Sequence, residues 1–144
     1  MLNVLIKNAK VYYENEIVQA DMLVCDGTVA SVGVGITVSE NTPVVDGQGL
    51  FVFPGFADVH VHLREPGFFY KETIETGTQS AAKGGFTLVC SMPNLNPVPD
   101  SAENLKAQQD IIDKDAVIKV LPYAAITVGE KGKELVNFEE IGDK

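Results

Sequence analysis

The first 53 residues alternate short apolar runs with turn residues, a pattern typical of small β structures. Asp26 and Gly27 form a preferred two-residue hairpin turn between two of these runs. Pro43 stands directly before another short apolar run. The pattern predicts a small β module over residues 1–53, with strands near 4–6, 11–13, 21–25, 29–32 and 44–45.

From residue 54 onward, strand-like runs alternate with helix-like runs. A strand at 56–63 precedes helical composition from Thr73 to Lys83, which ends at a Gly-Gly pair. The run 86–92 is continuously apolar, as in a parallel strand buried on both faces. Next we expect a helix capped by Asp100, with Glu103 as its capping-box partner, that runs to about 113. A strand should follow in the first half of 117–127 and end near Pro122. A third helix is expected to begin within 133–141.

This order of elements predicts an α/β fold with parallel strands and right-handed crossovers. A (β/α)₈ barrel takes roughly 200 residues at the least. About 90 residues follow the β module, which is room for about three βα units. The pattern therefore leaves two architectures open, a small open sheet or the first part of a barrel.

Composition and charge narrow the classes of function. The chain is 45% hydrophobic and 22% charged, which is typical of a folded domain rather than a disordered one. Its net charge of −9 disfavours nucleic acid and anionic membrane partners, and no apolar run approaches the roughly 20 residues of a membrane span. Cys25 and Cys90 lack CxxC spacing, and the N-terminus does not resemble a signal peptide. We therefore expect a cytoplasmic protein.

His60 and His62 are the only histidines and form a His-x-His pair. Residues i and i+2 of a strand share a face, so both imidazoles can converge on one metal ion. The carboxyl end of a parallel strand is also where sites form in such folds. The alternative is two surface histidines that are close by chance, and the bare pair leaves both interpretations open.

The surrounding segment resembles a known family. Residues 54–67 read PGFADVHVHLREPG, which is similar to the first barrel strand of the amidohydrolase superfamily, and the LREPG part resembles the dihydroorotase signature within it. Further similar motifs follow in order over essentially the whole chain: YKETI at 70–74, TGT at 76–78, AAKGGFT at 81–87 and MPNLNP at 92–97.

The resemblance implies an architecture. Residues 1–53 would be an N-terminal β module that is part of a composite β-sandwich. Residues 54–144 would be the first part of a metal-dependent (β/α)₈ TIM-type barrel, about three βα units. The chain is expected to be the N-terminal third of such an enzyme, ending before the active site is complete.

The resemblance also implies an activity. Dihydroorotases reversibly hydrolyse the cyclic amide of dihydroorotate to N-carbamoyl-aspartate in de novo pyrimidine synthesis, using two metal ions, usually zinc. His60 and His62 would bind the more buried ion, and the catalytic acid/base is expected beyond residue 144. Catalytic zinc typically has three protein ligands. Because this sequence has only two histidines, we expect the isolated chain to be inactive and to bind zinc weakly.

Two further residues are candidates for substrate binding. A guanidinium such as that of Arg64 can clamp a carboxylate with two parallel hydrogen bonds, and the resemblance implies that it binds the ring carboxylate of dihydroorotate. The alternative is a surface arginine paired with Glu65 or Glu72. The resemblance likewise implies a substrate contact at Asn94, whose alternative is a turn residue beside proline. Asp58, two residues before His60, is expected on the same face of the strand, where it either orients a ligating imidazole or accepts hydrogen bonds from neighbouring backbone amides.

Other functions remain as alternatives. Allantoinase-like enzymes are similar but usually lack an arginine at the position of Arg64, and hydantoinase-like enzymes have no Arg-Glu-Pro-Gly motif there. A non-catalytic homologue could serve as a structural subunit of aspartate transcarbamoylase, and a small module could bind metal through the histidine pair alone. A sheet left open at its edge is prone to pairing, so a homodimer is a further expectation.

Overall fold

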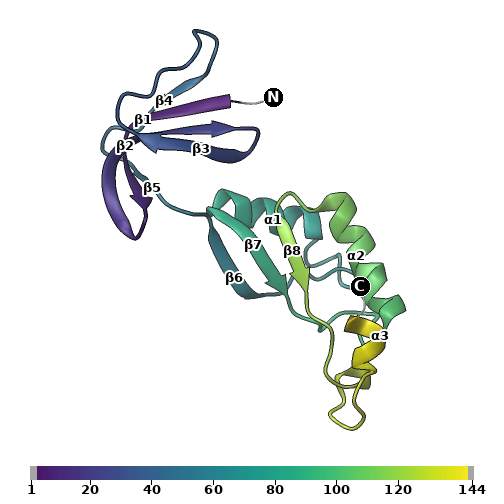
Figure 1. Ribbon diagram of the computed structural model, residues 1–144. Helices are drawn as coiled ribbons and strands as arrows, with labels where there is room; N and C mark the ends of the chain where they lie inside the picture. The colour runs from purple at the N-terminus through teal and green to yellow at the C-terminus, as the bar shows by residue number, and fades with distance from the viewer. Residues whose placement is uncertain (1–2, 143–144) are drawn as a thin grey trace. The chain divides into compact units, whose positions relative to one another are not determined.

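The computed structural model describes residues 3–142, and the chain divides into two compact units, one ending at Pro54 and the other beginning at Gly55 (Figure 1). The described residues of the first unit form strands and no helix, whereas the second unit combines parallel strands with helices. The expected α/β class is therefore confirmed as a mixed α/β fold. No helix within residues 3–142 is both long enough and apolar enough to cross a membrane.

The first unit is a five-stranded sheet built around one long strand, β1 (Asn3–Tyr13). β2 (Glu16–Cys25) pairs antiparallel with β1, and β3 (Thr28–Gly33) pairs antiparallel with β2. The short strands β4 (Val44–Asp46) and β5 (Phe51–Val52) both pair parallel with β1. This arrangement places β1 in the interior of the sheet.

The predicted hairpin turn is confirmed, but the expected division of residues 4–13 into two strands is wrong. Asp26 and Gly27 both have positive φ, +50° and +76°, as a type I′ turn requires. β1 runs unbroken, with an irregular register between Ile6 and Ala9 and a φ of +58° at Asn8. A β-bulge absorbs an extra residue without ending the strand, so the polar residues here interrupt the apolar pattern but not the sheet.

The buried carboxylate of Asp21 stabilises this bulge. Its Oδ1 accepts a hydrogen bond from the Asn8 amide at 3.0 Å, and its Oδ2 accepts from the amides of Gly35 at 3.1 Å and Ile36 at 3.2 Å. The bond from Asn8, followed by those from the other two amides, lowers the pKa of the Asp21 carboxyl despite the opposing effect of burial. Asp21 thus joins the bulge to the segment that follows β3.

We expect Asp21→Asn to lower the free energy of unfolding by about 2 kcal/mol at pH 7, because hydrogen bonds to a charged group are lost. The folded-state pKa lies below the unfolded value of about 3.9, so the contribution is complete above about pH 4 and disappears as the pH falls through the folded value. Urea denaturation at pH 7 and pH 3 measures both effects. Asp26→Asn is the control, since Asp26 is exposed; equal losses for the two variants would contradict the assignment.

The second unit contains a three-stranded parallel sheet in the order β6 (Phe56–Val61), β7 (Phe86–Ser91), β8 (Lys119–Pro122). The helices α1 (Ile74–Lys83) and α2 (Ala102–Asp115) connect successive strands and contact each other and the sheet (Figure 1). The core between helices and sheet consists of Leu63, Ile74, Val89, Ile112 and Val120.

Several predicted boundaries in this unit are confirmed. α1 begins after Thr73, whose side chain caps it, and its C-cap is Gly84. In the middle strand β7, the adjacent residues Val89 and Cys90 are both buried, although successive side chains point to opposite faces. β8 ends at Pro122, as the missing amide of proline predicts.

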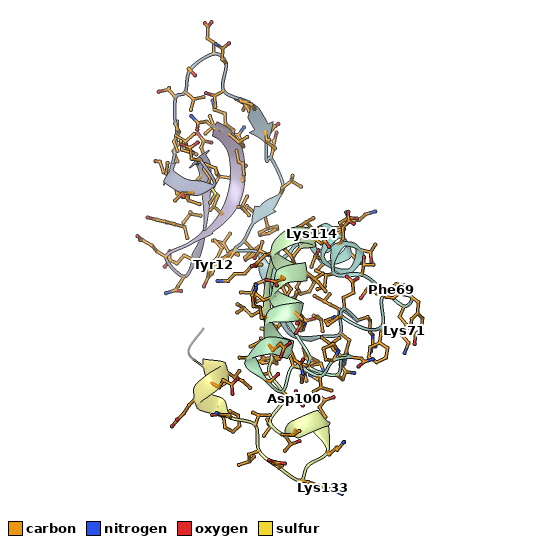
Figure 2. The ribbon with its side chains drawn as sticks, turned by 90° about the vertical axis from the view of Figure 1, so that its right-hand side faces the viewer. Tyr12, Phe69, Lys71, Asp100, Lys114 and Lys133 are labelled. Carbon is orange, nitrogen blue, oxygen red and sulfur yellow. The ribbon has the colours of Figure 1, made fainter. Side chains whose placement is uncertain are left out.

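The predicted cap of α2 is wrong by one residue. Ser101 is the N-cap, and its side chain accepts a hydrogen bond from the Asn104 amide at 3.2 Å. The carboxylate of Asp100 instead accepts from the Gly129 amide at 2.7 Å and from the Asn104 side chain at 3.0 Å, which lowers the pKa of Asp100. Asp100 and Lys114 lie at opposite ends of α2 (Figure 2). The Asp100 carboxylate therefore bonds to a residue distant in sequence and does not cap the helix.

The expected third helix does begin within 133–141, but only in the second half of this segment. Only α3 (Phe138–Gly142) is helical there, after a 3₁₀ turn, η1 (Val128–Glu130). The preceding residues pair with an earlier segment, because Thr127 and Leu135 form an isolated antiparallel bridge. These hydrogen bonds between two segments of the chain replace the bonds between residues four apart that a helix would need.

Candidate metal and substrate-binding site

A bulge in β6 sets the direction of the histidine side chains. Asp58 is opposite Val89 of β7, and Val61 is opposite Ser91, so three steps along β6 match two along β7. Register partners share a face of the sheet, which places Asp58 and Val61 on the helix-covered face with Val89. His60 therefore lies on the other face, and the expectation that Asp58 and His60 share a face is wrong.

Asp58 has a structural role that follows from the bulge. Its Oδ1 accepts a hydrogen bond from the His60 backbone amide at 3.0 Å. The bulge removes this amide from the strand ladder, and an unpaired backbone donor is costly. Of the two roles left open for Asp58, the structure favours acceptance of a neighbouring backbone amide.

The two imidazoles are close enough to share one ion. The ring centroids of His60 and His62 are 5.3 Å apart and the ring planes are inclined by 68°. A zinc–nitrogen bond of about 2.0–2.1 Å plus a ring radius of about 1.1 Å puts each centroid about 3.2 Å from a shared ion, and a tetrahedral angle then separates the centroids by about 5.2 Å. The separation of the two side chains fits a common zinc ion.

His62 also contacts Asn94. The ring Nδ1 of His62 lies 2.7 Å from Oδ1 of Asn94. His62 follows β6 and Asn94 follows β7, and the carboxyl ends of neighbouring parallel strands meet at one edge of a sheet. The structure thus brings together three of the four candidate residues: His60, His62 and Asn94.

These residues do not make a complete metal site. Within residues 3–142, no three histidine, cysteine, aspartate or glutamate side chains gather closely enough to hold a metal ion. A catalytic zinc ion typically needs three protein ligands and an open position. The described residues fit zinc in chemical type and separation, but they supply two ligands.

Arg64 lies in a strained turn just after the histidines. Its φ is +66°, and the Glu65 amide donates to the Leu63 carbonyl at 2.9 Å, the hydrogen bond of a γ-turn. Left-handed backbone costs about 1–2 kcal/mol for a residue with a Cβ, and such strain clusters at functional sites. Among the described residues the guanidinium forms no ion pair, so the predicted alternative of pairing with Glu65 or Glu72 is wrong.

Glu65 has a role that the sequence analysis missed. Its Oε2 accepts a hydrogen bond from the Ile74 amide, the first of α1, at 2.7 Å. Helix N-termini carry unpaired amides and a partial positive charge, which a carboxylate satisfies. Glu65 therefore anchors the loop that carries Arg64 to α1. Its position directly before a proline gave no local signal for a helix nine residues away.

We expect Glu65→Ala to lower the free energy of unfolding by about 1–2 kcal/mol, since a charged partner of a helix-end amide is removed. Glu75→Ala is the matched control, because Glu75 is an exposed acid in the first turn of the same helix. Thermal denaturation of the two variants separates the anchoring bond from the general effect of an acidic side chain near the helix start. Equal losses would show that the Glu65 bond contributes nothing.

The loop around Glu65 packs directly against the loop that carries Asn94. The Asn96 amide donates to the Pro66 carbonyl at 3.2 Å. At Gly67, where φ is +98°, an added Cβ would lie 2.3 Å from the Asn96 carbonyl oxygen. Only glycine permits this approach of two backbones, so the two sequence motifs meet as one structural unit. Phe69 and Lys71 lie farther along the first loop, at the surface (Figure 2).

A buried polar pair, Gln108 and Ser91, links α2 to the last residue of β7. Gln108 of α2 donates from Nε2 to the Ser91 hydroxyl at 2.9 Å, and both residues are fully buried. Within the described residues, the Oε1 of Gln108 has no hydrogen-bond partner. The signal in the sequence was a glutamine between Leu105 and Ile112 on the apolar side of α2, which was overlooked.

Comparisons with known proteins identify the family to which the chain is similar. A family model described as dihydro-orotase-like matches residues 49–143. The chain is 55% identical over 134 residues to a dihydroorotase of Staphylococcus aureus, covering 93% of this chain and 32% of that protein. It is 50% identical over 141 residues to a dihydroorotase of Bacillus cereus, covering 97% of this chain and 33% of that protein.

Among solved structures, an L-hydantoinase (dihydropyrimidinase) from Arthrobacter aurescens matches with a TM-score of 0.81 and 27% sequence identity. The match covers 98% of this chain and 30% of that chain. The chain therefore spans about a third of the length of the curated relatives it matches. Because the family model covers well over half of the chain, the chain belongs to the dihydroorotase-like family.

Proposed function

We propose that this chain supplies the first part of a dihydroorotase, a metal-dependent enzyme that reversibly hydrolyses dihydroorotate to N-carbamoyl-aspartate in pyrimidine synthesis. The observation that carries the proposal is the convergence of His60, His62 and Asn94 at one edge of a parallel sheet. The family match and the 50–55% identity to dihydroorotases support the choice of reaction.

The architecture that belongs to this proposal is a TIM-type barrel. The parallel strands β6, β7 and β8 with their helices would be its first βα units, and residues 1–53 would belong to a composite β-sandwich. The similarity to an L-hydantoinase structure over nearly the whole chain supports a shared architecture. A cytoplasmic location, a homodimer and an association with aspartate transcarbamoylase remain predictions.

Each side chain has a separate task in this proposal. His60 and His62 would hold one of two zinc ions. When bound, a divalent ion polarises the amide carbonyl and lowers the pKa of water so that it attacks at neutral pH. Arg64 would bind the ring carboxylate through parallel hydrogen bonds, and Asn94 would add a donor to the same group. The acid/base that protonates the leaving nitrogen would come from outside residues 1–144.

A local positive charge is needed because the chain carries a net charge of −9 and its proposed substrate is an anion. Within residues 3–142, no carboxylate forms an ion pair with Arg64, so its charge is not compensated by a direct partner. The carboxylate of Glu65, its neighbour, instead accepts a hydrogen bond from the Ile74 amide at the start of α1. The loop therefore leaves the Arg64 guanidinium without an ion-pair partner among the described residues, while the Glu65 carboxylate is hydrogen-bonded to α1.

A hybrid enzyme tests the proposal. The matched first third of the S. aureus dihydroorotase is replaced by this chain, and hydrolysis of dihydroorotate, hydantoin and allantoin is measured together with zinc content. We expect activity on dihydroorotate alone. Activity on hydantoin would favour the hydantoinase alternative, which the similarity to the L-hydantoinase structure supports. A folded, zinc-loaded hybrid without activity would favour a non-catalytic subunit.

The chain by itself tests the remaining alternative, a small metal-binding module. Such a module would bind zinc tightly and stoichiometrically, whereas two ligands should bind weakly. Equilibrium dialysis of the 144-residue chain against zinc distinguishes them. The two ligands present among the described residues lead us to expect weak binding.

A further inference from the structure

Asn94 contacts His62 through an atom that constrains both side chains. A carboxamide oxygen only accepts hydrogen bonds, and a carboxamide nitrogen only donates them. The 2.7 Å contact joins Oδ1 of Asn94 to Nδ1 of His62. A hydrogen bond there requires a proton on Nδ1, and in a neutral imidazole this leaves Nε2 with its lone pair.

We propose that Asn94 is a positioning residue for His62, in addition to any contact with substrate. The bond from Nδ1–H to Asn94 would hold His62 in the tautomer whose Nε2 can ligate a metal ion. The same bond would turn the carboxamide so that Nδ2, a donor, faces an anionic substrate. This inference rests on the proposed function, because it assigns a metal ion to Nε2 of His62 and an anionic substrate to Nδ2 of Asn94.

The surrounding backbone holds Asn94 in place for this task. The Met92 amide donates to the Val61 carbonyl at 2.8 Å, directly beside His62. The Leu95 amide donates to the Pro93 carbonyl at 2.7 Å, and the Leu95 side chain is buried. Asn94 is therefore fixed on both sides although its own side chain is exposed.

The two histidines are held by different means. His60 is fixed through its backbone amide, which donates to Asp58, and among the described residues its ring has no hydrogen-bond partner. His62 is fixed through its ring. Metal-bound histidines almost always donate the second ring N–H to an acceptor, and loss of that acceptor typically weakens metal binding 10- to 100-fold. Asn94 provides that acceptor for His62.

Two substitutions separate the roles of Asn94. Asn94→Asp keeps an acceptor for His62 but replaces the donor by a negative charge. Asn94→Ala removes both the acceptor and the donor. Asn96→Ala is the matched control, because Asn96 is an exposed asparagine in the same loop whose side chain forms no hydrogen bond among the described residues.

The first experiment records long-range ¹H–¹⁵N spectra of the histidine rings in the metal-free 144-residue chain, above the ordinary titration range of histidine. We expect His62 to show a protonated Nδ1 in the wild type, in Asn94→Asp and in Asn96→Ala, and a shift toward protonated Nε2 in Asn94→Ala. The tautomer of His60 should stay the same throughout. A protonated Nε2 on wild-type His62 overturns the proposal without any variant, and so does an unchanged His62 in Asn94→Ala.

The second experiment adds zinc to the same samples and follows the ring nitrogens. We expect Asn94→Ala to raise the zinc Kd about tenfold or more, and Asn94→Asp to leave it no weaker than the wild type. In the hybrid enzyme, Asn94→Asp should retain zinc and lower kcat/KM for dihydroorotate about 100-fold, since like charges oppose each other. An inactive wild-type hybrid would count against the proposed function, whereas the tautomer result would stand on its own.

Discussion

Replacing His62 with alanine is expected to lower kcat/KM of the hybrid dihydroorotase by about 10³-fold or more. The side chain would supply one of the two metal ligands in this chain, and its ring lies at the separation from His60 that a shared zinc ion requires. A metal ion that polarises a carbonyl contributes several kcal/mol to stabilisation of the transition state. His60→Ala should have an effect of similar size.

Zinc content is the measurement that gives this result its meaning. We expect both histidine variants to lose zinc in parallel with activity, as determined by metal analysis of the purified hybrid. Val59→Ala is the control, because Val59 directly precedes His60 on β6, is 63% exposed and has a side chain that cannot ligate a metal ion. Full zinc content with full activity in His62→Ala would show that this histidine is not a ligand.

Replacing Arg64 is expected to lower activity, and glycine at this position is expected to relieve backbone strain. In the hybrid, Arg64→Ala should lower kcat/KM for dihydroorotate about 10²- to 10³-fold, since a hydrogen bond to a charged group contributes about 1.5–3 kcal/mol and two would be lost. Arg64→Lys should recover little of this, because an ammonium group lacks the planar pair of donors. An Arg64→Lys variant as active as the wild type would exclude the two-bond clamp.

The stability effect comes from the backbone. Arg64 has a φ of +66°, which costs about 1–2 kcal/mol for a residue with a Cβ but not for glycine. We therefore expect Arg64→Gly to raise the free energy of unfolding of the 144-residue chain by about 1 kcal/mol relative to Arg64→Ala. Both variants remove the guanidinium, so urea denaturation of the pair isolates the strain. Equal stabilities would mean that the turn is not strained.

Strain at Arg64 would then reflect function rather than folding. A glycine at this position would satisfy the γ-turn at lower cost, but it would offer no side chain for a carboxylate. The neighbouring anchor from Glu65 to α1 helps to hold the turn in its conformation. In the proposed enzyme, the loop would thus give up some stability to direct one cationic side chain.

Local signals in the sequence determined much of the fold. The cap at Thr73 and the glycines after Lys83 set the ends of α1, and Asp26-Gly27 set the first hairpin. The continuous apolar run of β7 indicated a strand buried on both faces. These features depend on interactions between residues a few positions apart, so they can be inferred from spacing and residue type.

The candidate site was predictable to a similar degree. The His-x-His pair and its flanking motifs indicated a metal site at the end of a strand, and the structure places His60, His62 and Asn94 together. Arg64 has no hydrogen bond or ion pair with these three among the described residues. Its assignment to the same site therefore depends on the family resemblance.

Tertiary structure decided which partner each polar group has. The bulge in β6 moved Asp58 to the face opposite His60, and the Gly129 amide took Asp100 from the end of α2. Glu65 and Asn94 likewise found partners 9 and 32 residues away, at the start of α1 and on His62. Periodicity and capping rules describe only neighbours along the chain. Hydrogen bonds between distant segments depend on how strands register and loops meet, and that is settled only when the chain folds.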